Sequence, residues 1–187
     1  MMSIILASAS PRRAELLAQI GLQFSVKPAD IDESRFKDED PSDYVMRLSK
    51  EKALALGRTD AVVLAADTVV VIDQEVLGKP KNRADGLSML MRLSGRDHEV
   101  LTGISVMRGD LLVSRVVSSI VTFKLIDQDF AEKYWATGEP RDKAGSYGIQ
   151  GLGAIFVAHL VGSYSNVMGL PLFETASLLS EAGVVIL

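Results

Sequence analysis

The sequence predicts an α/β fold in which helices flank a long mixed β-sheet, with residues 1–187 forming one domain. Strand-like and helix-like segments alternate along the chain, which is typical of a sheet covered by helices. Two expected hairpins interrupt this alternation, so we expect a mixed sheet rather than a purely parallel one. Residues 61–72 are almost continuously apolar, and such a strand belongs at the centre of a sheet because neither of its faces can meet water.

Short apolar runs bounded by turn residues predict the strands. The expected strands cover residues 3–7, 22–26, 61–72, 75–77, 98–107, 111–124 and 153–160, and residues 184–187 can add an edge strand. Asp73 and Gln74 are expected to form the turn of the first hairpin. Arg108, Gly109 and Asp110 are expected to form the turn of the second.

Apolar residues at helical spacing, together with start and stop signals, predict the helices. The expected helices cover residues 12–20, 41–56, 82–93, 127–136 and 170–181. Ser10 before Pro11 is typical of a helix start, since serine caps free N–H groups and proline fits the first turn. Tyr134 and Trp135 are expected to be packing residues of their helix, and the acidic residues 30–40 to form a loop.

The composition excludes several classes of protein. Hydrophobic residues make up 48% of the chain and charged residues 24%, which is globular rather than disordered composition. The chain contains no cysteine, which excludes disulfides, thiolate metal sites and cysteine nucleophiles. Two histidines cannot build a three-histidine zinc site, so carboxylates must hold any metal, and they favour Mg²⁺ or Mn²⁺. His98 and His159 lie in strand-like segments and are expected to be structural.

The charge and the apolar pattern bear on partners and location. A net charge of −4 argues against a nucleic-acid partner. No window approaches the roughly 18 consecutive apolar residues that a membrane helix needs, so no membrane partner is expected. Residues 1–10 carry a short apolar stretch before Arg12 and Arg13, whereas a signal peptide carries its charges first. We therefore expect a cytoplasmic protein.

Residues 8–13 form the first candidate site, where a strand ends and a helix begins with Arg12 and Arg13. The start of a helix exposes free N–H groups and a partial positive charge, which attract phosphate. Two guanidinium groups would strengthen such a site. A capped helix with solvated arginines explains the same residues equally well.

Asp67, followed by Thr68, lies within the most apolar strand. A carboxylate in such surroundings is costly unless it is paired, hydrogen-bonded or bound to a metal, and catalytic acids and metal ligands often occupy such positions. The structural alternative is an aspartate that accepts backbone hydrogen bonds at a bend of the strand. We favour the functional interpretation.

Two lysines and an acidic loop complete the charged set. Lys52, on the second expected helix, and Lys79, in Gly-Lys-Pro, are each more often simply solvated. Together with the two arginines they would supply enough positive charge for a triphosphate. The loop that carries Asp30, Asp32 and Glu33 is usually solvated surface, but one of its carboxylates could reach a metal.

Residues 142–151 form a glycine-rich segment that contains Lys143 and Gln150. Glycines permit close approach of the backbone to a ligand, and a glutamine amide can both donate and accept hydrogen bonds. The alternative is an irregular loop with turn glycines. The segment matches neither a P-loop nor a dinucleotide fingerprint.

The ordered set of motifs resembles the Maf family of nucleoside triphosphate pyrophosphatases. The matching pieces are ILASASPRR, Glu33, Glu51-Lys52, AADT, GKP, KAGSYGIQG and GSYSNVMGLPL. The resemblance implies a fold like that of the inosine-triphosphate pyrophosphatases, with two lobes and a central cleft. It also implies hydrolysis of a nucleoside triphosphate substrate to the monophosphate and pyrophosphate, a divalent metal cation, and a homodimer.

The resemblance also assigns roles to single residues. It implies that Asp67 is the catalytic base and that the other polar site residues line the cleft: Ser8, Arg13, Glu33, Lys52, Lys79 and Lys143. We further hypothesise that Glu33 and Asp67 hold the metal, and that Ser8, Arg13, Lys52, Lys79 and Lys143 bind phosphate and substrate. Arg12, Thr68 and Gln150 match the subgroup that acts on dTTP and UTP. The chemistry of one of these positions fits, because uracil offers both an acceptor and a donor to an amide such as that of Gln150.

Two other functions remain open from the sequence. One is a nucleotide-binding regulator of cell division with little turnover, although a regulator would not need the base Asp67. The other is a pyrophosphatase for a non-canonical purine nucleotide, against which Arg12, Thr68 and Gln150 argue. Modified pyrimidine nucleotides are further candidate substrates.

Overall fold

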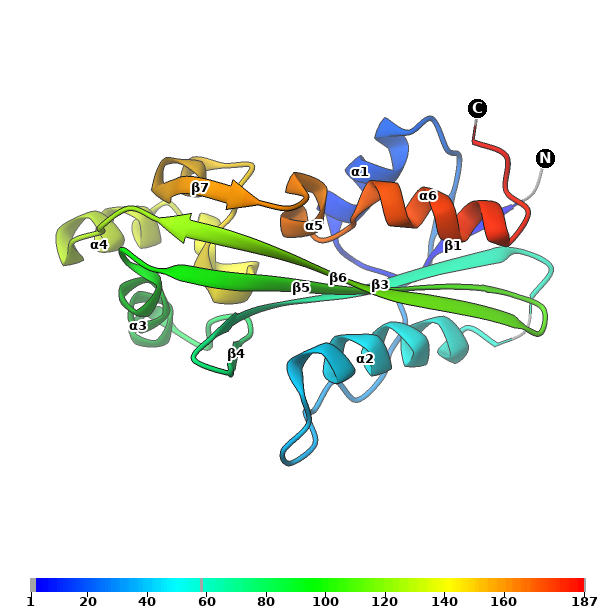
Figure 1. Cartoon of the computed structure of the whole chain (residues 1–187), viewed down its shortest axis with the longest axis horizontal. Coiled ribbons are helices and arrows are strands. Elements are labelled where there is room, and N and C mark those ends of the chain that lie inside the picture. Colours follow the sequence, from blue (N-terminus) through cyan, green and yellow to red (C-terminus); the bar gives the residue numbers. More distant parts are fainter. Residues whose placement is uncertain (1–2, 58, 187) are drawn as a thin grey trace. The chain divides into compact units, whose positions relative to one another are not determined.

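The computed structural model describes residues 3–57 and 59–186 of the chain (Figure 1). The strands are β1 (Ile4–Leu6), β2 (Ser25–Val26), β3 (Val62–Ile72), β4 (Glu75–Leu77), β5 (Asp97–Arg108), β6 (Leu111–Phe123) and β7 (Val157–Val161). The helices are α1 (Pro11–Gln19), α2 (Pro41–Ala55), α3 (Arg83–Leu93), α4 (Gln128–Ala136), α5 (Tyr164–Met168) and α6 (Leu172–Glu181). Three short 3₁₀ helices follow α4: η1 (Glu139–Asp142), η2 (Ala144–Ser146) and η3 (Leu152–Phe156). No helix within the described ranges is long and apolar enough to cross a membrane.

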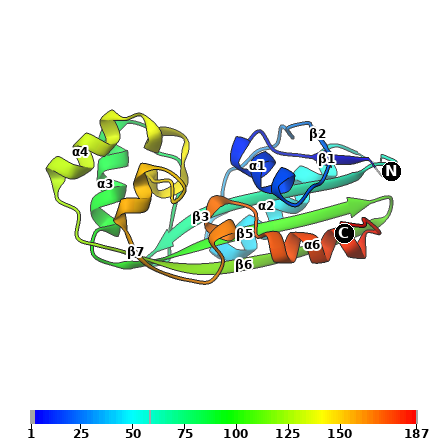
Figure 2. The same cartoon turned by 90° about the horizontal axis from the view of Figure 1, so that it is seen from above.

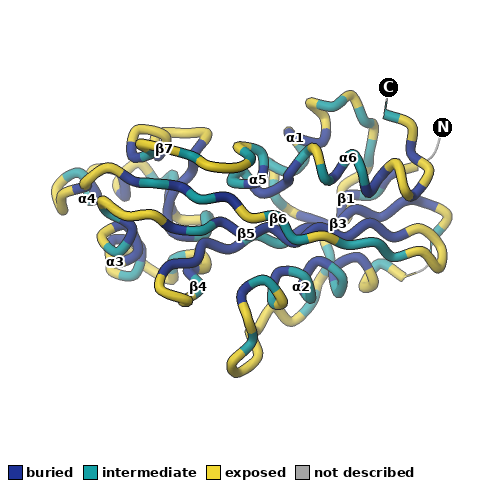
Figure 3. The backbone as a smooth tube through the Cα atoms, in the orientation of Figure 1, coloured by how far each residue is buried: buried dark blue, intermediate teal, exposed yellow. Residues whose placement is uncertain are grey.

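The strands form one mixed sheet in the order β2-β1-β3-β5-β6-β7, and β4 also pairs with β3. β1 runs parallel to both β2 and β3, whereas the β3–β4 and β6–β7 pairs are antiparallel. The prediction of a mixed α/β sheet is therefore confirmed. The expected central strand is also confirmed, because every residue of β3 is buried except Asp67 and Thr68 (Figure 3).

The chain divides into two compact units, and β3, β5 and β6 contribute residues to both. Unit 1 comprises Met1–Asp67, Thr102–Val117 and Gly169–Leu187. Unit 2 comprises Thr68–Leu101 and Ser118–Met168. Asp67 is thus the last residue of unit 1 along β3, and Thr68 is the first residue of unit 2. The prediction that residues 1–187 form one domain remains a prediction.

Within unit 1, α1 and α6 cover one face of the sheet and α2 covers the other (Figure 1). Helix α2 lies very close to β5, because a Cβ atom at Gly103 would lie 2.2 Å from the carbonyl oxygen of Val45. Ser49 of α2 also bonds Ser105 of β5, with 2.8 Å between the two hydroxyl oxygens. Glycine at position 103 and the serine pair therefore fix α2 against the sheet.

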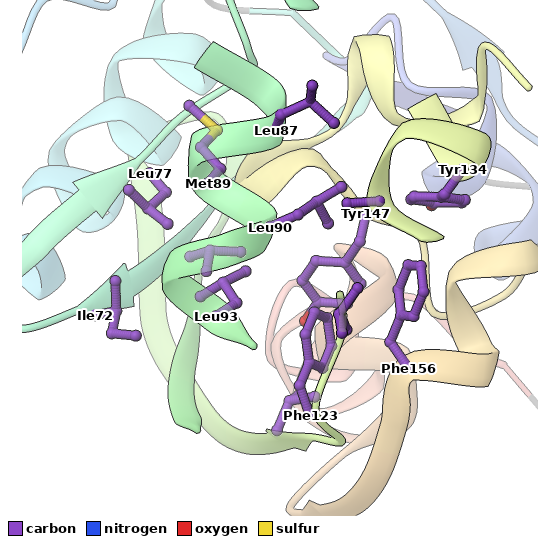
Figure 4. Close-up of a cluster of buried hydrophobic side chains, with 14 of the residues drawn as sticks. Ile72, Leu77, Leu87, Met89, Leu90, Leu93, Phe123, Tyr134, Tyr147 and Phe156 are labelled. Atoms are coloured by element: carbon purple, nitrogen blue, oxygen red, sulfur yellow. The ribbon is translucent and has the colours of Figure 1, made fainter. Parts of the chain in front are cut away.

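Within unit 2, α3 and α4 lie side by side (Figures 1 and 2). Both pack into a cluster of buried apolar and aromatic side chains that includes Leu90, Phe123, Tyr147 and Phe156 (Figure 4). The aromatic rings meet mostly edge to face, as between Phe123 and Tyr147, whose centroids lie 4.7 Å apart. Tyr134 and Trp135 belong to this cluster, so their prediction as packing residues is confirmed.

Most predicted elements are confirmed, but three predicted strands need correction. The strand predicted at 22–26 is only two residues long, Ser25–Val26. Residues 153–160 do not form one strand, because η3 occupies Leu152–Phe156 and β7 begins only at Val157. The predicted edge strand at 184–187 is wrong for residues 184–186, and residue 187 lies outside the described residues. There, Gly183 adopts a positive φ of 84° and the N–H of Val184 bonds the carbonyl of Leu179, which turns the chain at the end of α6.

Candidate active site

Lys52 of α2 holds two carboxylates of unit 1 together. Its ammonium Nζ donates to Asp67 Oδ1 at 2.6 Å and lies 2.7 Å from Glu33 Oε1. Lys52 is only 8% exposed, and a buried ammonium is costly unless anions compensate its charge. We call Glu33, Lys52 and Asp67 the carboxylate–lysine cluster.

The pairing of β1 with β3 brings residues 8–13 to this cluster. Leu6 lies opposite Leu64 in a parallel register, and the N–H of Ala7 bonds the carbonyl of Leu64 at 2.8 Å. Ser8 therefore lies just beyond the carboxyl end of β1, and Asp67 lies within β3, three residues after the paired Leu64. Sites in α/β folds commonly lie beyond the carboxyl ends of parallel strands, as Ser8 does here.

Arg13 is held in place rather than solvated. Its Nη1 donates to Ser8 Oγ at 3.0 Å, and its Nε donates to the carbonyl of Gly169 at 2.8 Å. Burial lowers the pKa of the Arg13 guanidinium, and the charges of Asp67 and Glu33 oppose that shift. Arg13 thus lies within electrostatic reach of the cluster, which favours the functional interpretation of this arginine. Ser10 occupies the predicted cap position of α1, but its side chain makes no capping hydrogen bond.

Glu33 lies on the predicted acidic loop, and α2 holds this loop. The Tyr44 hydroxyl donates to the carbonyl of Glu33 at 2.7 Å. Arg47 donates to the carbonyl of Ser34 at 3.0 Å and to both carboxylate oxygens of Glu39, at 2.6 and 2.9 Å. We call this arrangement around Arg47 the Arg47 clasp. Its hydrogen bonds to Glu39 raise the pKa of Arg47.

The loop contacts distinguish among the acidic residues that the sequence left open. The carboxylate of Glu33 reaches Lys52. The carboxylate of Asp32 instead accepts the N–H of Ser34 at 2.9 Å, which is a local turn contact. Tyr44, Glu39 and Arg47 were not singled out from the sequence, because their contacts with the loop span 3 to 13 residues along the chain and no local pattern marks them.

In unit 2 a backbone hydrogen bond joins the two predicted lysine motifs. The N–H of Gly145 donates to the carbonyl of Gly78 at 3.1 Å, which fixes the segment of Lys143 beside that of Lys79. Lys143 Nζ donates to the carbonyl of Glu139 at 2.6 Å and to Asp142 Oδ1 at 2.8 Å. Lys79 is exposed at the surface of the unit.

The glycines of residues 142–153 accommodate side chains of the protein itself. A Cβ atom at Gly151 would lie 2.4 Å from Glu139 Oε2, and one at Gly148 would lie 2.8 Å from Cε of Lys143. A Cβ atom at Gly153 would lie 2.7 Å from the Tyr134 hydroxyl. From the sequence these glycines were interpreted as allowing close approach of a ligand, whereas the structure places side chains of the protein, Glu139 among them, against their backbone.

The structure thus places the predicted residues in two groups. Unit 1 contains those linked to the carboxylate–lysine cluster by bonds or charge, namely Ser8, Arg13, Glu33, Lys52 and Asp67, with Arg12 next to Arg13 in α1. Unit 2 contains Thr68, Lys79, Lys143 and Gln150. His98, expected to be structural, is buried and bonds the Tyr147 hydroxyl at 2.9 Å, whereas His159 is exposed on β7.

The oxygen donors of the cluster suit a hard divalent cation. Among the described residues no group of three or more histidine, aspartate or glutamate side chains could hold a metal. Mg²⁺, however, is usually held by only one or two carboxylates together with substrate phosphates and water. Glu33 and Asp67 already share one positive charge, that of Lys52. These two carboxylates therefore fit such a cation.

A family model described as "Maf-like protein" matches residues 3–182. The chain belongs to this family. It is 54% identical over 183 residues to the dTTP/UTP pyrophosphatase of Vibrio parahaemolyticus, a match that covers 96% of this chain and 97% of that protein. It is 52% identical over 181 residues to the dTTP/UTP pyrophosphatase of Vibrio cholerae, covering 95% and 97%. The resemblance predicted from the motifs is confirmed.

A solved structure shares the fold at low sequence identity. The HAM1 protein from Coxiella burnetii matches with a TM-score of 0.54 and 16% identity, over 97% of this chain and all of that chain. At this identity the match supports the fold alone. The predicted α/β fold is thus found in a solved protein of a different sequence.

Proposed function

We propose that this Maf-like protein hydrolyses dTTP and UTP to the nucleoside monophosphate and pyrophosphate. The relatives named dTTP/UTP pyrophosphatase support this function, since they match the chain at 50–54% identity over nearly its full length. The observation that carries the chemistry is the near-buried Lys52 ammonium between Asp67 and Glu33. The carboxylate–lysine cluster thus places a positive charge suited to phosphate next to a carboxylate that can act as a base.

Asp67 is the base in the proposed reaction. Lys52 engages Oδ1 of this carboxylate, and Oδ2 accepts a proton from the water that attacks the α-phosphorus. A carboxylate held by an ammonium is fixed in orientation, which is what proton transfer to a positioned base requires. The bond that breaks joins the α-phosphorus to the bridging oxygen, and pyrophosphate leaves.

Positive groups stabilise the charge that develops on the phosphate oxygens. Lys52 and Arg13 supply positive charge from unit 1, and the start of α1 adds free N–H groups. Lys79 and Lys143 are the corresponding lysines of unit 2. Ser8, whose hydroxyl accepts from Arg13, keeps that guanidinium oriented.

In this proposal Glu33 and Asp67 would hold a divalent cation, Mg²⁺ or Mn²⁺. When bound, such a cation neutralises phosphate charge and favours departure of pyrophosphate. Lys52 pairs with both carboxylates and keeps them close together. The Arg47 clasp keeps Glu33 within their reach, although Glu33 lies on a loop.

Arg12, Thr68 and Gln150 select the base in this proposal. An exposed glutamine amide can accept from N3–H of a uracil or thymine ring and donate to O4. Cytosine presents a different pattern at these positions and would pair poorly with the same orientation of the amide.

The family resemblance further supports a cytoplasmic homodimer. Light scattering of the purified protein measures its mass in solution and so tests whether it is a dimer.

The experiment that tests the function is pyrophosphate release from dTTP, UTP, CTP, ITP and 7-methyl-GTP with Mg²⁺ or Mn²⁺. We expect release chiefly from dTTP and UTP. Release chiefly from ITP or 7-methyl-GTP would retain the reaction and refute the substrate. Binding without release from any nucleotide would support a nucleotide-binding regulator instead.

Asp67→Asn provides the test of the base, because it keeps the shape and removes the proton acceptor. We expect turnover to fall by a factor of about 10²–10⁴, with nucleotide binding largely retained. Asp129→Asn is the matched control, since Asp129 is an exposed carboxylate that pairs with the nearby Lys133. Wild-type turnover in Asp67→Asn would exclude Asp67 as the base.

A further inference from the structure

Gln150 lies at the tip of a tight turn in unit 2. The N–H of Gly151 donates to the carbonyl of Gly148 at 3.3 Å, which closes the turn around Ile149 and Gln150. Ile149 is buried in the apolar cluster of the unit, whereas Gln150 is exposed. The direction of the Gln150 side chain therefore depends on how firmly the two ends of the segment 148–153 are held.

A single carboxylate, that of Glu139, holds one end of this segment directly. Its Oε2 accepts the N–H of Leu152 at 2.8 Å, and its Oε1 accepts the N–H of Gly153 at 3.0 Å. The Tyr134 hydroxyl donates to the same Oε1 at 2.7 Å. Hydrogen bonds to an ionised acceptor are about twice as strong as neutral ones.

Tyr134 extends this grip to the other end of the segment. Its hydroxyl oxygen accepts the N–H of Gly148 at 3.1 Å while its O–H donates to Glu139. Figure 4 shows the Tyr134 ring beside Phe156, and the two ring centroids lie 4.8 Å apart, so the phenol is itself anchored in the core. We call Tyr134 and Glu139 the tyrosine–glutamate clasp.

Electrostatics favour the ionised form of Glu139 in this clasp. Burial by itself raises the pKa of the carboxyl, but the hydrogen bonds from Tyr134, Gly153 and Leu152 and the charge of Lys143 outweigh it. The net effect is a pKa below its usual value. The carboxylate can therefore accept all three hydrogen bonds at neutral pH.

The sequence of the segment matches this clasp. The Glu139 carboxylate leaves no room for a side chain at Gly151, and the Tyr134 hydroxyl leaves none at Gly153. Helix α4 does not depend on the clasp for its start, because the Asp127 carboxylate caps it by accepting the N–H of Phe130 at 2.8 Å. The contacts of the Glu139 carboxylate thus serve the segment that carries Gln150.

We propose that Glu139 is a positioning residue for base selection: through the tyrosine–glutamate clasp it fixes the direction of Gln150. This inference rests on the proposed function, since it assigns Gln150 to the base of the nucleotide. The Glu139 carboxylate is engaged by groups of the protein itself, namely the Tyr134 hydroxyl and the N–H groups of Leu152 and Gly153. Its loss should affect discrimination among bases, whereas Asp67 and Lys52, which carry the chemistry, are held by a separate set of contacts in unit 1.

Glu139→Gln is the decisive variant, because it keeps the size of the side chain and replaces one acceptor oxygen by a donor NH₂ group. We expect KM for dTTP to rise about 10-fold and kcat to change less than about 3-fold. The ratio of kcat/KM for dTTP to that for CTP should fall by about 10-fold. Glu132→Gln is the matched control, because Glu132 lies on α4 and pairs with Arg83 at the surface.

Hydrogen exchange supplies a second readout that does not depend on turnover. In Glu139→Gln the amides of residues 148–153 should exchange faster than in the wild type, and in Glu132→Gln they should not. Tyr134→Phe, which removes only the hydroxyl, should reproduce both effects and serves if Glu139→Gln fails to fold. Unchanged exchange, or faster exchange with an unchanged dTTP/CTP ratio, overturns the inference.

Failure of the proposed function can be told apart from failure of this inference. If the wild type releases pyrophosphate from no nucleotide, the proposed function is wrong. The dissociation constants of dTTP and CTP are then compared by calorimetry in the wild type and in Glu139→Gln. A loss of discrimination in the variant still supports the positioning role of Glu139, and an unchanged ratio refutes it.

Discussion

Unit 1 and unit 2 each hold a candidate site residue on a loop with one half-buried ion, but they do so in opposite ways. In unit 1 a cation, Arg47, reaches out from α2 and gathers the carbonyl of Ser34 and the carboxylate of Glu39. In unit 2 an anion, Glu139, gathers backbone N–H groups of its loop. The loop of Glu33 is acidic and needs a cation, whereas the loop of Gln150 is glycine-rich and offers donors.

The difference indicates a division of labour. The Arg47 clasp holds the loop of Glu33, which in the proposed function binds the metal, so its failure should weaken the chemistry for every nucleotide. The tyrosine–glutamate clasp holds the segment of Gln150, which in the proposed function contacts the base, so its failure should weaken selection. Rate and selectivity should therefore respond to different variants.

Among the variants that test this division, the largest effect is expected from Lys52→Met, which removes the charge shared by Asp67 and Glu33. Pyrophosphate release should fall by about 10²–10³-fold, because a preorganised charge at the phosphates is lost. The dTTP/CTP ratio should stay as in the wild type. Lys50→Met on the same helix is the control, and a changed ratio in Lys52→Met would break the proposed division between the units.

A change of pH should weaken unit 2 through His98. Burial lowers the pKa of this histidine from 6.5 to about 4, so the folded chain keeps it neutral while the unfolded chain binds a proton. The unfolded state then takes up more protons between pH 6.5 and about 4, and stability falls as the pH falls through that window. The loss amounts to about 3 kcal/mol, from about 1.4 kcal/mol per pH unit.

Urea unfolding at several pH values measures this loss. The drop in unfolding free energy between pH 7 and pH 4 should be smaller in His98→Asn than in the wild type. His159→Gln should match the wild type, since His159 is exposed on β7. An equal drop in all three proteins would mean that His98 is not the buried neutral group described above.

Gly151→Ala should break the clasp of unit 2 without changing any functional group. The added methyl group would lie 2.4 Å from Glu139 Oε2, so the carboxylate must move away. The dTTP/CTP ratio should fall by about 10-fold, as in Glu139→Gln. In the double variant Gly151→Ala/Glu139→Gln the dTTP/CTP ratio should fall no further than in either single variant, because both changes remove the same contacts. If the losses of the two single variants added in the double variant, Gly151 would act independently of the tyrosine–glutamate clasp.

The smallest effect is expected from Arg47→Lys, which keeps the charge and removes the planar fork that binds both oxygens of Glu39. The Mg²⁺ concentration for half-maximal activity should rise by a factor of about 3–10, because the support of a metal-binding carboxylate is weakened. Arg115→Lys, at an exposed pair with Glu181 in unit 1, is the control. An unchanged Mg²⁺ dependence would show that neither Glu33 nor its loop contributes to metal binding.

The sequence predicted the elements whose signals are local. The apolar run 61–72 marks a buried strand by itself, and β3 occupies Val62–Ile72. Asp127 marks the start of α4, and its side chain caps that helix. Asp67 was recognised because a carboxylate within such a run demands a partner, and Lys52 supplies it.

The contacts that the sequence did not predict join residues that lie far apart along the chain. Residues 152–156 are apolar enough for a strand, but Glu139 takes up the N–H groups of Leu152 and Gly153 and favours a 3₁₀ helix instead. Glu139 lies 13 residues before Leu152, and a lone glutamate before a proline carries no signal of its own. The spacing of Gly148, Gly151 and Gly153 is the one trace that the clasp leaves in the sequence.

Gly103 has a consequence for how the chain tolerates change. The backbone of Val45 lies against it without room for a methyl group, and Lys52 follows Val45 by seven residues, two turns along the same face of α2. A substitution at position 103 would lift the helix and carry the ammonium away from Asp67. A mutational survey scored by activity should therefore find position 103 as intolerant as the site itself, although it contributes no side chain to any contact.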